Sequence, residues 1–292
     1  MDIIPGIHHI TGITKSYKDN YEFYKGILGL RFLKETVNFD DNYSYHLYYG
    51  DNTGKPGSAL TFFVIPEARK GNIGNGQVYM IIFNIPPNSK KYWKSRLEEK
   101  GISIEKDDEG YLEFKDPEGL KLGLKEGEAE FEPNNETDIP SEFQLRGFNG
   151  VGLYSYEEEY TKALLAEMGF KNKGTKIVSE SGNELFISSS GSTSTMGYGS
   201  IHHIAFRTQD ENHSYEWRNA LLQRGLQVSP ITERYYFKSV YFGEPGGILF
   251  ELATDGPGFM RDEDDVEDLG KGLKLPPWLE DRRAEIERNL KG

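Results

Sequence analysis

The sequence predicts an α+β protein built from four copies of one strand–helix–three-strand (βαβββ) unit. Four helix-like segments each end in glycine followed by an apolar residue. A strand-like run precedes each of these helices, and further short strand-like runs follow it, separated by Gly, Asn, Asp or Pro. Glycine readily takes the left-handed conformation that ends a helix. The four ends are Leu28-Gly29-Leu30, Lys100-Gly101-Ile102, Met168-Gly169-Phe170 and Arg224-Gly225-Leu226.

The order of the elements supports the repeat. The first strand of each copy is expected over residues 7–13, 78–85, 150–154 and 202–207. The second and fourth copies close alike: each has a strand, a turn that contains proline and glycine, and another strand, in residues 114–123 and 242–251. The third copy is the least clear, because residues 190–199 have the composition of a polar loop.

The chain is expected to divide at a linker rich in Glu, Asn and Pro. Residues 1–126 would hold the first pair of modules, 127–143 the linker, 144–260 the second pair and 261–292 an acidic and helical tail.

Two details of these connecting segments are also predicted. The acidic runs 126–136 and 262–268 have the composition of solvated connectors. The tail helix is expected to open near Pro277 and to pack on the body through Trp278, Ile286 and Leu290.

Composition excludes several classes of function. The 292 residues include no cysteine, so disulfides and thiolate metal sites are excluded and a reducing cytoplasm fits. A net charge of −13 argues against a nucleic-acid partner. No stretch approaches the roughly 20 apolar residues of a membrane span, and the N-terminus lacks the pattern of a secretory signal.

Two histidine pairs are the strongest chemical signal. Four of the six histidines form the pairs His8-His9 and His202-His203, and each pair is followed by Ile in the first strand of a module. Neighbours in a strand face opposite sides, so one member of each pair can face a shared interior. A lone histidine is more often an ordinary core or surface residue, but two identically placed pairs favour metal ligands.

The internal repeat identifies a third ligand. Glu251 lies in an apolar strand, where an unpaired carboxylate is costly to bury. Its counterpart in the second copy is Gly123, and that of His203 is Gly150 in the third copy and about Tyr79 in the second. The ligand positions are therefore filled only in copies one and four, which must face each other around a single metal site.

Two histidines and one carboxylate are typical of non-haem Fe(2+), with open positions left for a substrate and for O2. We expect His9, His203 and Glu251 to hold Fe(2+). Mn(2+) and Zn(2+) accept the same ligands and are the less favoured choices.

With these motifs the sequence resembles the vicinal-oxygen-chelate superfamily, whose members pair βαβββ units into two half-barrel domains. Within it, the chain is most similar to ring-cleaving dioxygenases that act on hydroquinones. The resemblance covers nearly the whole chain. The stretches that carry it are residues 6–11, 45–49, 54–57, 69–77, 201–206, 245–251 and 258–259 with the acidic run after them.

The resemblance implies iron ligands at His9, His203 and Glu251. It also implies roles around the substrate for a further five residues, which are His8, Thr11, His202, Arg234 and Tyr241.

The residue types agree with those roles. Tyr241 lies on the strand before Glu251, and its hydroxyl could bind a phenolate oxygen or act as an acid. Arg234 could hold an anionic intermediate, and His202 or Tyr241 could move protons. His46 is a weaker substrate-binding candidate, and His213, near a helix start, is expected at the surface.

The expected function is therefore a cytoplasmic Fe(2+)-dependent dioxygenase that opens a hydroquinone-type ring with O2, with a homo-oligomer compatible with the sequence. The nearest alternative is an extradiol catechol dioxygenase. A second is a lyase or transferase of the superfamily; a glyoxalase would need a fourth ligand where Gly123 and Gly150 stand. A metal-free binding protein would lack the triad, so Glu251 argues against it.

Overall fold

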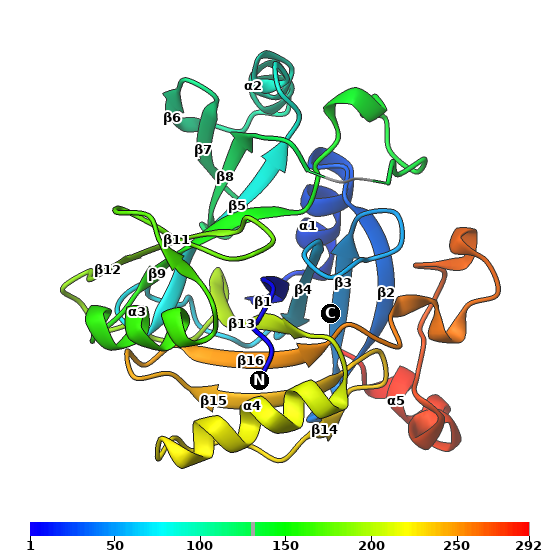
Figure 1. Cartoon of the computed structure of the whole chain (residues 1–292). Coiled ribbons are helices and arrows are strands. Elements are labelled where there is room, and N and C mark those ends of the chain that lie inside the picture. The colour runs from blue at the N-terminus through cyan, green and yellow to red at the C-terminus, as the bar shows by residue number, and fades with distance from the viewer. Residues whose placement is uncertain (130–131, 292) are drawn as a thin grey trace.

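The computed structural model describes residues 1–129 and 132–291. Glu130 and Phe131 of the expected linker, and Gly292 of the tail, lie outside the described residues. The described chain forms two mixed eight-stranded sheets with few helices (Figure 1). None of its helices is long and apolar enough to cross a bilayer.

The first sheet has the strand order β14-β15-β16-β13-β1-β4-β3-β2. Its strands are β1 (Ile7–Thr14), β2 (Arg31–Asn38), β3 (Asp41–Gly50), β4 (Ala59–Val64), β13 (Ser200–Thr208), β14 (Thr232–Glu233), β15 (Lys238–Gly243) and β16 (Leu249–Thr254).

The second sheet has the strand order β10-β11-β12-β9-β5-β8-β7-β6. Its strands are β5 (Gln77–Ile85), β6 (Ile104–Asp108), β7 (Tyr111–Lys115), β8 (Lys121–Glu126), β9 (Phe148–Tyr154), β10 (Lys171–Asn172), β11 (Ile177–Val178) and β12 (Glu184–Ser188).

Each module contributes one main helix, and the tail adds another. These are α1 (Tyr17–Tyr21), which continues as a π-helical turn over Glu22–Ile27, α2 (Lys90–Glu99), α3 (Glu158–Glu167), α4 (Glu211–Gln223) and α5 (Arg283–Asn289). Short 3-10 turns occupy Ser141–Phe143, Phe259–Asp262, Val266–Asp268 and Pro277–Arg282.

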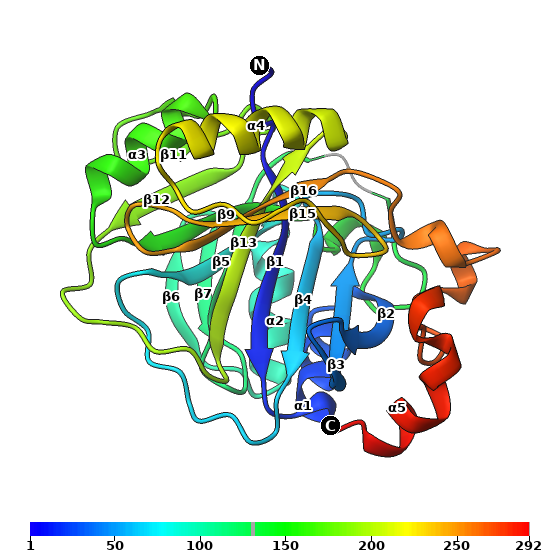
Figure 2. The ribbon, with the colours of Figure 1, turned by 90° about the horizontal axis from the view of Figure 1, so that it is seen from below.

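The strand order confirms the predicted four βαβββ modules. Copies one and four share the first sheet through the antiparallel pair β1–β13, which Figure 2 shows side by side, and copies two and three share the second through β5–β9. Each sheet therefore takes one module from each half of the chain. The division into two domains at the linker remains a prediction about the chain's organisation.

The helix ends follow the predicted rule. Gly29, Gly101, Gly169 and Gly225 have φ angles of 70°, 76°, 98° and 81°. These left-handed conformations are costly for residues with a side chain, which explains why glycine recurs at the same place in every module.

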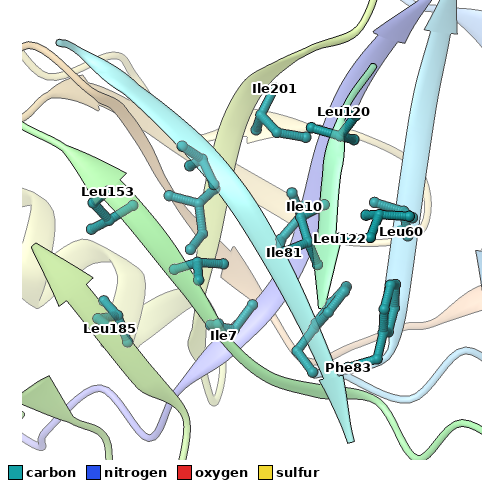
Figure 3. Close-up of a cluster of buried hydrophobic side chains, with 14 of the residues drawn as sticks. Ile7, Ile10, Leu60, Ile81, Phe83, Leu120, Leu122, Leu153, Leu185 and Ile201 are labelled. Atoms are coloured by element: carbon teal, nitrogen blue, oxygen red, sulfur yellow. The ribbon is translucent and has the colours of Figure 1, made fainter. Parts of the chain in front are cut away.

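The core lies where the two sheets face each other. Ile7 and Ile10 of β1 meet Ile81 and Phe83 of β5 in one continuous buried cluster (Figure 3). Strands β13 and β5 are also in contact. Because one face of the first sheet is committed to this core, its opposite face is left to line a cavity.

The tail follows the prediction in part. Ile286 is fully buried, and Leu290 packs on the same small cluster. Trp278 is 52% exposed, although its ring contacts those of Phe39 and Tyr235. The tail helix begins as a 3-10 turn at Pro277 before it becomes α-helical.

The expectation that residues 262–268 form a solvated connector is wrong at its start. Lys34 of β2 is fully buried, and its ammonium group contacts Asp262 Oδ1 at 2.6 Å and the Glu263 carboxylate. The side chain of Glu263 is only 1% exposed and also pairs with Lys274. These carboxylates are there to neutralise a buried lysine, which composition alone could not reveal.

Candidate metal centre

Both histidine pairs lie at β-bulges. The register of β1 with β13 skips one residue at His8 on one strand and one at His202 on the other. A bulge adds one residue and re-aims the side chains beside it. The two neighbours of each pair, expected on opposite faces, therefore lie close enough to hydrogen-bond. The Nδ1 atoms are 2.9 Å apart in His8-His9 and 2.7 Å apart in His202-His203.

The second member of each pair meets Glu251 in the interior. The Nε2 atoms of His9 and His203 are 3.3 Å apart, and Glu251 Oε2 lies 3.3 Å from the first and 2.8 Å from the second. All three side chains are buried. They come from β1, β13 and β16, so copies one and four meet here as the repeat predicted.

The hydrogen bonds of His8 determine where the proton of His9 sits. His8 Nε2 lies 3.0 Å from the carbonyl oxygen of Thr254, which can only accept, so this nitrogen carries a hydrogen. Burial, and then the field of His9, lower the pKa of His8 to about 3, so its ring is neutral and its Nδ1 is an acceptor. His9 Nδ1 must then donate to it. A His9 ring that binds a metal through Nε2 would then direct the lone pair of this atom at the space between Glu251 and His203.

The pair His202-His203 differs from the first pair because its outer member, His202, lines the cavity. Burial, and then the field of His203, lower the pKa of His202 to about 4. If His203 offers Nε2 as a ligand, its Nδ1–H donates to His202 Nδ1, and the hydrogen of His202 stays on Nε2. His202 lines the cavity described below, so it would present this N–H there.

Glu251 is an incompletely satisfied buried carboxylate. Its Oε1 accepts a short hydrogen bond from Ser239, whereas its Oε2 makes no geometrically acceptable hydrogen bond. Burial by itself would raise the pKa of Glu251, but the fields and contacts of His9 and His203 hold it well below its usual range. An ionised carboxylate oxygen and imidazole lone pairs repel each other unless a cation lies between them, so these residues fit a divalent metal.

The second sheet has the same bulges, but the described part of the chain holds no comparable cluster there. The skipped residues there are Tyr79 and Asn149. The counterpart of His203 in copy two is therefore Met80, one residue after the predicted Tyr79, whereas Gly150 in copy three agrees with the prediction.

The glycines of that sheet leave room for aromatic side chains. A Cβ at Gly123 would lie 2.8 Å from the hydroxyl of Tyr111, and one at Gly152 would lie 2.3 Å from the ring of Tyr79. Within residues 1–129 and 132–291, the cluster of His9, His203 and Glu251 is the one group of three or more potential ligands.

A cavity of about 340 Å³ opens beside the triad. Five of the six residues expected around the substrate line it: Thr11, His46, His202, Arg234 and Tyr241. His8 does not; it lies behind His9, against a smaller cavity of about 190 Å³. The remaining wall is mostly apolar and is made by Ile13, Asn38, Phe39, Asp40, Tyr48, Phe63, Ile65, Phe237 and Leu249.

Tyr241 and Arg234 form the polar side of this cavity. Tyr241 is the cross-strand partner of Glu251, and its ring centroid is 5.6 Å from that of His203. The Arg234 guanidinium lies 5.3 Å from the centroid of the Tyr241 ring. It also pairs with Asp40 of the β2–β3 turn at 2.9 Å, which joins copies one and four across the cavity.

Several contacts were not anticipated. Ser239 lies two residues before Tyr241, so strand alternation could have placed it on the same face. Phe237, whose ring centroid is 4.8 Å from that of His9, gave no comparable signal. The prediction that His213 lies at the surface is wrong. The residue is 6% exposed, and its ring contacts the carbonyl oxygen of Asp2 and the indole of Trp217.

The paired βαβββ sheets and their two-histidine, one-carboxylate cluster define a class of protein, and comparisons agree. Residues 131–252 match the family model described as the Glyoxalase/Bleomycin resistance protein/Dioxygenase superfamily. The candidate ring-cleaving dioxygenase MhqA of Bacillus subtilis (strain 168) is 40% identical, over 99% of this chain and 98% of its own length. The chain belongs to this superfamily.

A more distant relative is the chlorohydroquinone/hydroquinone 1,2-dioxygenase of Sphingobium indicum, 28% identical over 98% of this chain and 96% of its own. The crystal structure of a candidate dioxygenase from Bacillus subtilis subsp. subtilis str. 168 superposes with a TM-score of 0.93 at 37% identity. The superposition covers 99% of this chain and 97% of the Bacillus subtilis chain. Glyoxalase I from Zea mays shares the fold, with a TM-score of 0.59 at 16% identity. This superposition covers 85% of this chain and 92% of the glyoxalase chain.

Proposed function

We propose that this protein is an Fe(2+)-dependent ring-cleaving dioxygenase that opens a hydroquinone-type ring with O2, and that His9, His203 and Glu251 hold the iron. The observation that carries the proposal is the buried convergence of these three ligand groups beside a cavity, with Glu251 Oε2 lacking a hydrogen bond. The similarity to ring-cleaving and hydroquinone dioxygenases supports it. Bound iron would supply the redox chemistry that lets an aromatic ring react with O2.

The cavity suits a flat aromatic substrate. Phe39, Phe63 and Phe237 offer ring faces and edges, and Ile65 and Leu249 add aliphatic surface. An aromatic ring of hydroquinone size fits within about 340 Å³. These walls exclude water from the reacting ring and hold it beside the triad.

The polar groups have separate tasks in this proposal. His202 would direct Nε2–H at a substrate oxygen and move a proton there. Arg234, held by Asp40, would stabilise negative charge on the substrate, and the Tyr241 hydroxyl would donate to an oxygen beside the metal. Burial, and then the Glu251 charge, raise the pKa of Tyr241, so the phenol stays protonated and able to donate.

This set of groups favours hydroquinones over catechols. A hydroquinone would need only one oxygen on the metal, so the protein must recognise the far hydroxyl, whereas a catechol would use both oxygens as ligands. Thr11, His202, Arg234 and Tyr241 provide more polar contacts than a chelated catechol needs. A site built to hydrogen-bond a hydroxyl rejects an analogue that lacks it.

The decisive experiment is anaerobic loading with Fe(2+), followed by O2 uptake on hydroquinones and catechols. We expect a higher kcat/KM for hydroquinones. Tyr241→Phe should lower kcat by about 10²-fold or more while iron content stays the same, because the tyrosine acts on the substrate. Tyr49→Phe, which removes a buried hydroxyl bonded to Asn20 outside the cavity, is the matched control. A preference for catechol would favour the extradiol alternative, and an unaffected Tyr241→Phe enzyme would remove the proposed role of this residue.

A further prediction concerns the residue that orients the carboxylate. Ser239→Ala removes the hydrogen bond to Glu251 Oε1 without touching a metal ligand. Such outer partners typically contribute about 10–100-fold to metal affinity, so we expect a loss of that size. Competition with a chelator under anaerobic conditions measures the metal affinity. The control is Ser229→Ala, because the Ser229 hydroxyl accepts a hydrogen bond from the backbone N–H of Tyr241 and does not contact Glu251. Unchanged affinity would show that Ser239 does not position Glu251.

From the sequence we also propose a cytoplasmic location, no nucleic-acid partner and compatibility with a homo-oligomeric state. The lyase or glyoxalase alternative gains no support from the triad, because no fourth ligand joins it among the described residues.

A further inference from the structure

Four uncharged side chains form an unbroken hydrogen-bonded chain along the cavity wall. Thr11 Oγ1 is 2.8 Å from Thr61 Oγ1, which is 2.8 Å from His46 Nε2; His46 Nδ1 is in turn 2.8 Å from the Tyr48 hydroxyl. We call this set the Thr11–Tyr48 chain. All four side chains are buried.

Strand register holds the chain in place. Thr61 of β4 is the cross-strand partner of Thr11 on β1 and also of Tyr48 on β3. His46 lies two residues before Tyr48, on the same face of β3. Three neighbouring strands therefore fix every link, and no loop is involved.

The two ends of the Thr11–Tyr48 chain open on the same cavity. Thr11, His46 and Tyr48 are among its lining residues, whereas Thr61, the middle link, is not. The Tyr48 ring packs against Tyr236 and Phe259, and its hydroxyl is bonded to His46 at the wall of the cavity.

Every link can run in either direction. Hydroxyl groups both donate and accept, and a neutral imidazole donates from one nitrogen and accepts at the other. His46 is kept neutral, because burial above all lowers its pKa well below the usual value, and both of its ring nitrogens are occupied by uncharged hydroxyl groups. The chain can thus reverse its direction if the imidazole exchanges its tautomer, with no charge left in the wall.

We propose that the Thr11–Tyr48 chain is a proton relay that moves one proton between two oxygen atoms of the reactants bound in the cavity. The inference rests on the proposed ring-cleaving function and adds Thr61, His46 and Tyr48 to it. Of these, Thr61 and His46 are positioning residues that act through the two ends.

The transfer balances atom by atom. A substrate hydroxyl gives its proton to Thr11, Thr11 passes its own to Thr61, and Thr61 passes its own to His46 Nε2. His46 releases the Nδ1 proton to Tyr48, and the Tyr48 hydroxyl gives its proton to an oxygen beside it. One proton leaves one reactant oxygen and one arrives at another, and no residue changes its charge. Ring cleavage by O2 starts from a hydroxyl that must lose a proton and creates oxygen groups that can take one.

The central test is Thr61→Val, which keeps the shape of the side chain and removes the middle hydroxyl of the chain. Thr61 does not line the cavity, so the substitution changes no direct contact with the substrate. We expect kcat to fall by about 10-fold or more. Iron content, and the anaerobic dissociation constant for hydroquinone measured optically, should stay at the wild-type values. Thr61→Ser restores a hydroxyl and should recover most of kcat, which a purely structural role would not predict.

A second pair of variants tests whether the chain works as a unit. Tyr48→Phe should reduce kcat to a similar extent, with Tyr49→Phe again as the control, and it serves if Thr61→Val folds poorly. In the double variant the two losses should not multiply, because either one already breaks the relay. Wild-type kcat in Thr61→Val, no recovery in Thr61→Ser, or multiplying losses would overturn the relay. A wild-type enzyme that cleaves no ring would instead overturn the proposed function.

Discussion

Replacing Glu251 by Gln is expected to abolish high-affinity iron binding. The substitution keeps the size of the side chain but removes the only negative charge in the cluster, which His9 and His203 contact at 3.3 and 2.8 Å. A neutral amide oxygen is a weak ligand for a divalent cation, and nothing else in the cluster would balance the charge of the ion. The loss should exceed the roughly 10–100-fold typical of partners outside the ligand set.

The measurement is iron content after anaerobic loading, together with the dissociation constant from chelator competition. Glu244→Gln is the matched control, because Glu244 is also a buried carboxylate at the same β15–β16 hairpin and bonds Thr161 and the backbone of Ile248. It should load fully. If Glu251→Gln keeps full iron content and turnover, Glu251 is not a ligand and the proposed centre is wrong.

The second large effect is expected on stability. Lys34→Met removes the fully buried ammonium group that neutralises Asp262 and Glu263. Among the described residues, Glu263, at 1% exposure, then keeps Lys274 as its one cationic partner. Breaking one side of a buried ion pair costs about 3–5 kcal/mol of unfolding free energy, because a charge is left in a poorly solvated place.

Urea unfolding of the metal-free protein measures the change. Lys106→Met breaks an exposed pair with Asp108 and should leave the transition unchanged. Lys34→Met combined with Glu263→Gln should be milder than Lys34→Met alone, since fewer charges are left unpaired. Equal stability of Lys34→Met and wild type would show that the pair does not anchor residues 258–274 to β2.

The four-fold repeat and the three candidate metal ligands could both be predicted from sequence patterns alone. Helix-ending glycines at the same place in every module identified four copies, because only glycine takes that left-handed turn without strain. The duplicated His-His-Ile motif and a carboxylate in an apolar strand singled out His9, His203 and Glu251. The repeat also implied that copies one and four meet, since the other copies carry no ligand at those positions. These are local signals, and local chemistry was enough to find them.

The orientation of the histidine side chains depends on strand pairing and could not be read from the sequence. The bulges at His8 and His202 depend on the pairing of β1 with β13, which are far apart in the sequence. At these bulges the His8 ring lies behind the site, whereas His202 lines the cavity. The same long-range register made Met80, and not Tyr79, the counterpart of His203.

Burial of polar groups was equally out of reach from sequence. Lys34 and Glu263 look like surface residues until the tail folds across β2, and His213 looks exposed until the N-terminus covers it. Thr61 links Thr11 to His46 behind the cavity only because β4 lies between β1 and β3. Sequence patterns report the preference of each residue for its own strand or helix. Which polar groups meet across strands is decided by sheet register and packing, which long-range contacts set.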